Sequence, residues 1–151
     1  MNFVVKHFRD LSTDELYELL RLRCEVFIVE QTCYYQDIDD SDRHPEVVHV
    51  LGYQDEKLAA YLRVLPKGAT YPDYPSLGRV VIGESARGQG TGHALVEAGV
   101  SACLSHYGEH AIKISAQSHL QTFYCRHGFE AVSEEYLEDG IPHIGMLRKA
   151  E

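Results

Sequence analysis

The sequence predicts a mixed α/β fold, in which helices pack on a β-sheet. Short runs rich in β-branched and aromatic residues alternate with two longer segments of helical periodicity. Repeats, low-complexity segments and Pro/Gly/Ser-rich linkers are absent, so we expect one domain over residues 1–151. A chain of 151 residues with a hydrophobic fraction of 44% is also long enough to bury a full core without disulfides or a structural metal.

The N-terminal segment predicts a strand followed by an amphipathic helix. Residues 2–8 alternate as a strand does. Ser12 and Glu15 form a capping-box pattern, in which the serine hydroxyl accepts from the N3 amide and the glutamate reaches back to the N-cap. We therefore expect a helix over about residues 13–28. Its expected apolar face consists of Leu16, Leu19, Leu20, Cys24 and Phe27.

Residues 30–46 hold an acidic stretch, residues 37–42, that we expect to form a solvated loop. Its spacing superficially suggests an EF-hand, but that motif needs glycine at position 6 and glutamate at position 12. Asp42 and Val48 stand at those positions, so calcium binding is not expected.

The rest of the chain predicts an alternation of strands and helices around a turn-rich loop. The helix that follows the glycine-rich segment is expected to pack closely through Leu95, Ala98, Gly99 and Ala102. The expected elements are a hairpin of strands 47–53 and 57–65, a loop over 66–76, a strand 77–83, a helix from 90 to about 106, a strand 111–116, a short helix 119–127 ended by Gly128, and strands 129–132 and 144–148.

Charge and composition exclude several classes of function. The formal net charge of −9 disfavours nucleic-acid binding, which needs a basic patch. This negative charge either attracts a cationic partner, such as an amine, or only keeps the protein soluble. No apolar run reaches the roughly 20 residues of a membrane span, and the N-terminus lacks the apolar core of a signal peptide. We therefore expect a cytoplasmic protein that does not act at a membrane.

The histidine and cysteine spacings do not predict a metal site. His106 and His110 are four residues apart, but Gly108 interrupts the segment and no third ligand is implied. The four cysteines form no CxxC pair, and without an export signal they are expected to be free thiols.

The most informative segment is a strand, a glycine-rich turn and a helix over residues 80–95. Glycines at positions 88, 90 and 92 let the backbone approach an anion, and the start of the helix leaves N–H groups unpaired. Arg87 adds a forked cation for phosphate oxygens. A Walker A motif would need a lysine here, and a dinucleotide fingerprint needs a G-x-G-x-x-G spacing. The turn therefore predicts a diphosphate site of another kind.

The run Arg87-Gly88-Gln89-Gly90-Thr91-Gly92 resembles the [QR]-x-x-G-x-[GA] signature of the GCN5-related N-acetyltransferase (GNAT) family. A second run, residues 123–129, resembles that family's F-Y-x-x-x-G-F. Residues 23–31 and 139–144 resemble the ElaA-like subgroup, so the resemblance covers nearly the whole chain. It implies a mixed, mostly antiparallel central sheet with helices on both faces, acetyl-CoA as co-substrate and no metal.

The resemblance also implies which residues hold the CoA moiety. The family grips the pyrophosphate with the glycine turn and lays the pantetheine arm along the preceding strand. Many relatives carry asparagine seven residues before the motif tyrosine, where Gln117 stands here. The implied residues are Val80, Val81, Ile82, Arg87, Gly88, Gln89, Gly90, Thr91, Gly92 and Gln117.

The reaction implied is transfer of an acetyl group to an amine of a small molecule or peptide. A backbone N–H near Val81 or Ile82 would stabilise the oxyanion. The leaving thiolate needs a proton or a hydrogen bond, and Tyr124 is the candidate acid that would supply it. An ammonium must lose a proton before it attacks, and His143 is the candidate base. Rival bases are Glu30, His49, His119 and a water. A non-catalytic CoA-binding module on the same fold is the alternative, and the acceptor, the acyl chain length and the choice between monomer and homodimer stay open.

Overall fold

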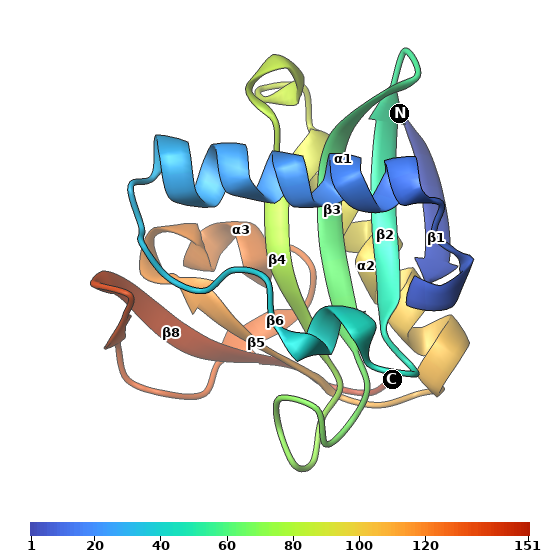
Figure 1. Cartoon of the computed structure of the whole chain (residues 1–151). Helices are drawn as coiled ribbons and strands as arrows, with labels where there is room; N and C mark the ends of the chain where they lie inside the picture. Colours follow the sequence, from blue (N-terminus) through green and yellow to red (C-terminus); the bar gives the residue numbers. More distant parts are fainter.

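The computed structural model describes residues 1–151 as one eight-stranded sheet with helices on both faces (Figure 1). The strand order is β1-β2-β3-β4-β5-β8-β6, with β7 paired to β8 outside this path. Only the contact between β4 and β5 is parallel. The strands are β1 (Asn2–His7), β2 (Val48–Gln54), β3 (Lys57–Leu65), β4 (Ser76–Ile82), β5 (Ile112–Gln117), β6 (Phe129–Ala131), β7 (Tyr136–Glu138) and β8 (Ile141–Arg148).

Two hydrophobic clusters lie on opposite faces of the sheet. In Figure 1, α1 (Thr13–Arg23) crosses in front of the strands and α2 (Thr91–Tyr107) lies behind them. Successive side chains of β3 point to opposite faces of the sheet, so this strand contributes to both clusters. Leu62 packs on the α2 side and Tyr61 on the α1 side. The short helix α3 (Gln121–Cys125) adds Tyr124 to the α2 side. The predicted mostly antiparallel sheet with helices on both faces is confirmed.

Gly99 is the closest approach between α2 and the sheet. A Cβ at this position would lie 2.7 Å from Leu62 Cδ2, so any larger residue would force the Leu62 side chain to move. Leu95 and Ala102 are buried beside it, whereas Ala98 is half-buried. The predicted packing face of this helix is therefore largely correct.

The first helix starts where the capping box predicts. Ser12 Oγ accepts from the Glu15 N–H at 3.0 Å, and Glu15 Oε1 accepts from the Ser12 N–H at 2.8 Å. After Arg23 the chain continues as a π-helix, Cys24–Glu30, instead of the expected α-helix to residue 28. The predicted apolar face is partly wrong, since Cys24 is exposed and the buried residues of this segment are Leu19, Leu22, Arg23 and Val26. The prediction looked for apolar residues at helical spacing. One of the four buried positions is an arginine, so the sequence pattern did not show which face is buried.

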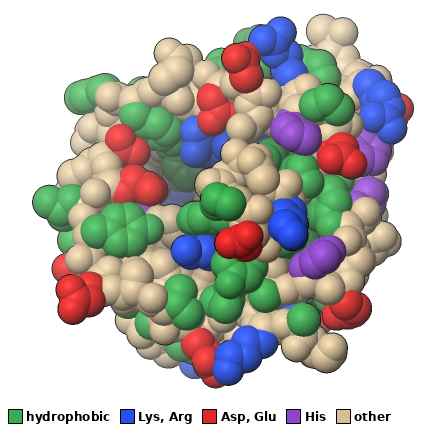
Figure 2. Space-filling view, turned by 90° about the horizontal axis from the view of Figure 1, so that it is seen from below, with side chains coloured by type: hydrophobic (Ala, Val, Ile, Leu, Met, Phe, Trp, Pro, Cys, Tyr) green, Lys and Arg blue, Asp and Glu red, His purple; other side chains and the backbone are tan.

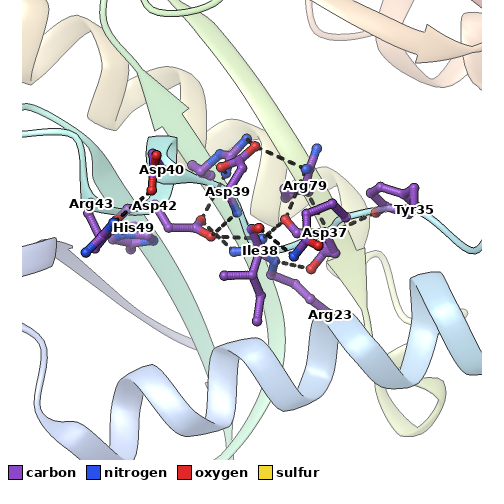
Figure 3. A network of polar contacts seen from close by, with 12 residues as sticks. Arg23, Tyr35, Asp37, Ile38, Asp39, Asp40, Asp42, Arg43, His49 and Arg79 are labelled. Carbon is purple, nitrogen blue, oxygen red and sulfur yellow. Dashed lines mark hydrogen bonds and ion pairs between the residues drawn. The ribbon is translucent and has the colours of Figure 1, made fainter.

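The expectation of a solvated acidic loop is wrong, because Asp37 and Asp42 are buried against Arg23. The Arg23 side chain is fully buried, and its Nε lies 2.9 Å from Asp37 Oδ2 while Nη1 lies 2.7 Å from Asp42 Oδ1. Figure 3 shows the loop wrapped over this guanidinium. Burial alone would raise the pKa of Asp42, but the hydrogen bond and charge of Arg23 outweigh it and the pKa is lowered.

Two further arginines complete this ion network, which we define as Arg23, Arg63, Arg79, Asp37, Asp39 and Asp42. Arg63 Nη1 lies 2.7 Å from Asp39 Oδ1 and 3.0 Å from Asp42 Oδ1. Arg79 Nε lies 2.8 Å from Asp37 Oδ1, close but not aligned as a hydrogen bond. The network therefore joins α1, β3 and β4 through one loop.

The sheet opens between β4 and β5. A bulge interrupts the β3–β4 register, and within it Arg79 adopts a left-handed φ of 52°. β4 pairs with β5 only at Ser76 and Lys113, and beyond that point the two strands diverge (Figure 1). One edge of β4 is thereby left without a neighbouring strand.

The C-terminal strands depart from the prediction. We expected a last strand from residue 144 with His143 in the turn before it, but β8 already starts at Ile141. His143 is therefore a strand residue, paired with Gln117 of β5 and Tyr136 of β7. The short strand β7 was not predicted because its three residues are too few to show a period.

The other predicted elements are confirmed to within a few residues. The expected helix 119–127 is shorter, a 3₁₀ turn Ser118–Leu120 followed by α3. All four cysteines are free thiols. No helix is both long enough and apolar enough to cross a bilayer.

Replacing Arg23 by methionine should destabilise the protein by about 3 kcal/mol, because Asp37 and Asp42 would lose a buried partner. The loss stays near the lower end of the range for such pairs, since Arg63 and Arg79 still face the two carboxylates. Denaturant unfolding measures it. The matched control is Arg21→Met, which breaks an exposed pair with Glu25 and should cost at most about 0.5 kcal/mol. Equal losses in the two variants would contradict the role given to the network.

Candidate active site

Two cavities lie along the open edge of β4 and meet at Tyr124. The Arg87 cavity lies beside the glycine turn, and the His143 cavity, of about 160 Å³, lies between β4, β5 and the β7–β8 hairpin. The residues that line both are Phe27, Gln31, Val80, Leu120 and Tyr124. A molecule that spans the two cavities must therefore pass the tyrosine.

The glycine turn presents a row of free backbone donors at the start of α2. Gly88 and Gly90 adopt left-handed φ values of 77° and 74°, and Gly90 is the N-cap of the helix. The N–H groups of residues 88–93 have no acceptor in the protein. A Cβ on Gly88 or Gly90 would meet nothing within 4 Å, so the space in front of the turn is open. Free N–H groups, a helix N-terminus and open space together suit a phosphate group.

Gly92 has a different role from the other two glycines. A Cβ there would lie 3.1 Å from Ile82 Cδ1 and 3.2 Å from Phe123 Cε1. The missing side chain lets α2 start close to the end of β4. Thr91 is buried at the same helix start, and Gln89 Oε1 accepts from Gln54 Nε2 at 3.1 Å.

Arg87 is held at the end of β4 by the backbone and by Glu30. Its Nε donates to the Ile82 carbonyl at 3.0 Å, and its Nη1 lies 2.9 Å from Glu30 Oε2. Both side chains are about 40% exposed, so the pair can open towards solvent. Arg87 therefore lies beside the open turn, and Glu30 competes with any anion that binds there.

The end of β4 offers backbone groups to the cavity. The Gly83 N–H donates to the Ala59 carbonyl of β3 at 2.7 Å, so by alternation the N–H and C=O of Ile82 point away from β3. The bond from Arg87 to the Ile82 carbonyl agrees with this direction. Val80 and Val81 also line the Arg87 cavity.

Tyr124 is buried at the junction of the two cavities. Its ring packs edge-on against Phe123 and Phe129, with centroid distances of 5.0 and 5.9 Å. Burial raises the pKa of Tyr124 to about 12, and its hydroxyl has no hydrogen-bond partner in the protein. The phenol is thus protonated near neutral pH and is a free donor.

His143 lines the second cavity from β8. Its Nδ1 lies 2.7 Å from the Ile141 carbonyl oxygen, which can only accept, so Nδ1 carries the proton. The Nε2 atom faces the Glu138 carboxylate, with Oε2 at 3.4 Å. Gln117, implied by the resemblance as a cofactor contact, lines this same cavity beside His143, its partner on the neighbouring strand, and does not line the Arg87 cavity.

Of the three rival bases, His49 and His119 lie outside both cavities, and Glu30 lines the Arg87 cavity. His49 is fully buried, accepts from the Tyr61 hydroxyl and donates to the Asp42 carbonyl, and burial lowers its pKa to about 4. His119 is exposed and lines neither cavity, and Glu30 is paired with Arg87. Among the histidines, His143 alone lines either of the two cavities.

The sequence-based prediction did not include Glu138, Tyr136 and Ser115, which lie around His143. The Tyr136 ring stacks on His143 with a centroid distance of 6.3 Å, and its hydroxyl bonds to Ser115 Oγ. A signal for them was present. Asp139-Gly140 is a favoured two-residue hairpin turn, both residues have positive φ, and such a turn sets Glu138 against Ile141.

Comparison with known proteins agrees with this geometry. Residues 9–150 match the family model of an acetyltransferase (GNAT) domain. The chain belongs to the GNAT family. It is 44% identical to protein ElaA of Escherichia coli over 143 residues, covering 95% of this chain and 93% of ElaA. An acyl-CoA N-acyltransferase from Pseudomonas aeruginosa superposes with a TM-score of 0.92 at 44% identity, over 98% of this chain and 99% of that one. The crystal structure of ElaA gives 0.91 at 42%, over 98% and 99%.

Family membership supports acyl-CoA-dependent acyltransferase activity, and the turn at Arg87 fits the diphosphate of such a substrate. The structure has no group of three or more His, Cys, Asp or Glu residues placed to hold a metal ion. Figure 2 shows acidic and basic side chains interspersed on one face and not gathered into a basic patch.

CoA at about 100 times its dissociation constant should stabilise the protein by roughly 2.7 kcal/mol, visible as a raised melting temperature. Gly90→Val should abolish this shift, because a branched side chain would fill the open space before the N–H groups. Gly140→Val is a matched control, since Gly140 has a φ of 76° and equally open surroundings. Both variants should lose about 1–2 kcal/mol to backbone strain, but only Gly140→Val should keep the CoA shift. A shift retained in Gly90→Val would rule out this turn as the phosphate site.

Proposed function

We propose that the protein transfers an acetyl group from acetyl-CoA to a primary amine of a small molecule or peptide, by direct attack in a ternary complex. The observation that carries the proposal is the meeting of the two cavities at Tyr124. One cavity offers donors suited to a diphosphate, and the other holds a histidine whose Nδ1 is bound to a carbonyl and whose Nε2 faces Glu138. The thioester would lie between them, within reach of the tyrosine.

The proposed transfer forms one C–N bond and breaks one C–S bond. The amine nitrogen attacks the thioester carbonyl carbon, the new C–N bond forms, and the C–S bond breaks. The amine proton passes to His143 Nε2, and the electron pair of the broken bond leaves with the CoA sulfur. The negative charge that develops on the carbonyl oxygen needs a fixed donor, and the Ile82 N–H points to the open side of β4.

Tyr124 suits a hydrogen-bond donor to the leaving sulfur better than a full proton donor. A simple thiol has a pKa of about 8.5, well below the value of about 12 for Tyr124. The proton therefore stays mainly on the phenol while the O–H···S contact stabilises the thiolate. A hydrogen bond to a charged group contributes about 1.5–3 kcal/mol, which is roughly a tenfold to hundredfold effect on rate.

Tyr124→Phe should lower kcat by at least about tenfold, because it removes the donor and keeps the ring. Rates of CoA release across a panel of amines, at saturating acetyl-CoA, measure the effect. The thermal shift with CoA should persist, which separates lost chemistry from lost folding. The control Tyr17→Phe changes an exposed tyrosine of α1 and should leave kcat unchanged. Full activity in Tyr124→Phe would mean that the thiolate leaves without this donor.

His143→Ala should slow acetylation more near pH 7 than near pH 9. At the higher pH a larger share of a typical alkylamine is already free base, so a protein base matters less. The expected loss at pH 7 is about 10²–10⁴-fold, the usual range for a general base. His119→Ala, at an exposed histidine outside both cavities, is the control. A loss that does not vary with pH would assign His143 a packing or orienting role.

A further inference from the structure

Two proton acceptors face each other at the His143 cavity. The Ile141 carbonyl holds a proton on His143 Nδ1, so whenever the ring is neutral its lone pair lies at Nε2. Glu138 Oε2 lies 3.4 Å from that atom and is also an acceptor. A charge-assisted hydrogen bond within the protein would be shorter, about 2.7–2.9 Å. The pair therefore lacks a donor that would satisfy both atoms.

The same cavity carries a surplus of negative charge. Glu138 and Asp139 both line it, and the only cationic lining residue is Arg79. That guanidinium is already engaged, since it lies 2.8 Å from Asp37 and 3.3 Å from Asp39 in the ion network. Lysine is absent from the lining. An incoming group gains most if it is a cation with several N–H donors.

We propose that Glu138 and His143 form the recognition site for the acceptor, and that the acceptor is a primary ammonium without a neighbouring carboxylate. This rests on the proposed function and specifies its substrate. The ammonium donates one N–H to Glu138 and one to His143 Nε2, and the proton on the second bond is the one His143 removes. Glu138 is half exposed, so it can swing to the wider spacing that two diverging N–H donors require.

The surrounding residues support this assignment. Ser115 Oγ lies 3.4 Å from Glu138 Oε1 and bonds the Tyr136 hydroxyl, so it links the carboxylate to the ring that stacks on His143. The Asp139 side of the cavity would repel an α- or β-carboxylate. Alkylamines and polyamines fit this chemistry, whereas free amino acids that react at the α-amine do not.

The test measures ammonium binding apart from catalysis. Protein labelled with ¹⁵N in its histidines is titrated with propylamine at pH 8, where propylamine is almost entirely cationic, and His143→Ala assigns the resonances. We expect the His143 signals to show Nδ1 protonated and Nε2 free, and Nε2 to shift on titration. 1-Propanol, of the same size without charge, should give no shift. β-Alanine, which adds a carboxylate, should bind at least several-fold more weakly.

Glu138→Gln should weaken propylamine binding about tenfold or more, since it replaces a charged acceptor by a neutral amide of the same shape. Glu135→Gln is the control, because Glu135 is an exposed neighbour outside both cavities. In turnover assays Glu138→Gln should raise KM for the amine and leave KM for acetyl-CoA unchanged.

Several outcomes would overturn the inference. These are equal propylamine affinity in Glu138→Gln and the unaltered protein, equal binding of 1-propanol and propylamine, a His143 ring protonated on both nitrogens at pH 8, and no propylamine binding. If acetyl transfer occurs while one of these holds, the transferase proposal stands and this recognition site does not. If propylamine binds as expected but no amine is acetylated, the recognition site stands and the transferase proposal fails.

Discussion

The buried ion network fixes the strand on which both cavities depend. Arg79 adopts a left-handed backbone conformation that costs a non-glycine residue about 1–2 kcal/mol. Its guanidinium is held against Asp37, and Asp37 in turn pairs with the fully buried Arg23. These contacts offset the strain and keep the bulge where β4 turns away from β5. The strained residue thus lies on the strand that lines both cavities, just beyond the one pair that joins β4 to β5.

The open strand explains why one fold can bring a long substrate and a small one together. In the proposed complex, the unpaired backbone groups along β4 would hold a chain-like molecule as a neighbouring strand does. The free N–H groups at the start of α2 suit the charged end of that molecule. Tyr124 lies where the two cavities meet, and its ring is held there by edge-on packing against Phe123 and Phe129. In this proposal, the site that holds the cofactor and the tyrosine that assists the reaction both lie along the open edge of β4.

Charge is ordered along this joined cavity. At one end lie the free amides and Arg87, whose charge is shared with Glu30, and at the other lie Glu138 and Asp139, which favour a cation. A net charge of −9 gives no hint of this order. Much of the acid in residues 37–42 is neutralised internally by arginines, so it adds little to the field at the site. The carboxylates that we propose for recognition lie on the β7–β8 hairpin.

The sequence alone determined what depends on neighbours in the chain. The capping box at Ser12, the glycine turn after β4 and most strands follow from residues a few positions apart, and the family motifs marked Arg87 and Tyr124. The tertiary structure decided what depends on distant partners. Arg23 and Asp37 are buried because each supplies the other's counter-charge, and His143 turns Nδ1 to the Ile141 carbonyl because β8 starts early enough to bring the two together. A side chain's charge, burial and tautomer are set by the atoms that surround it in space, and a linear pattern does not contain those atoms.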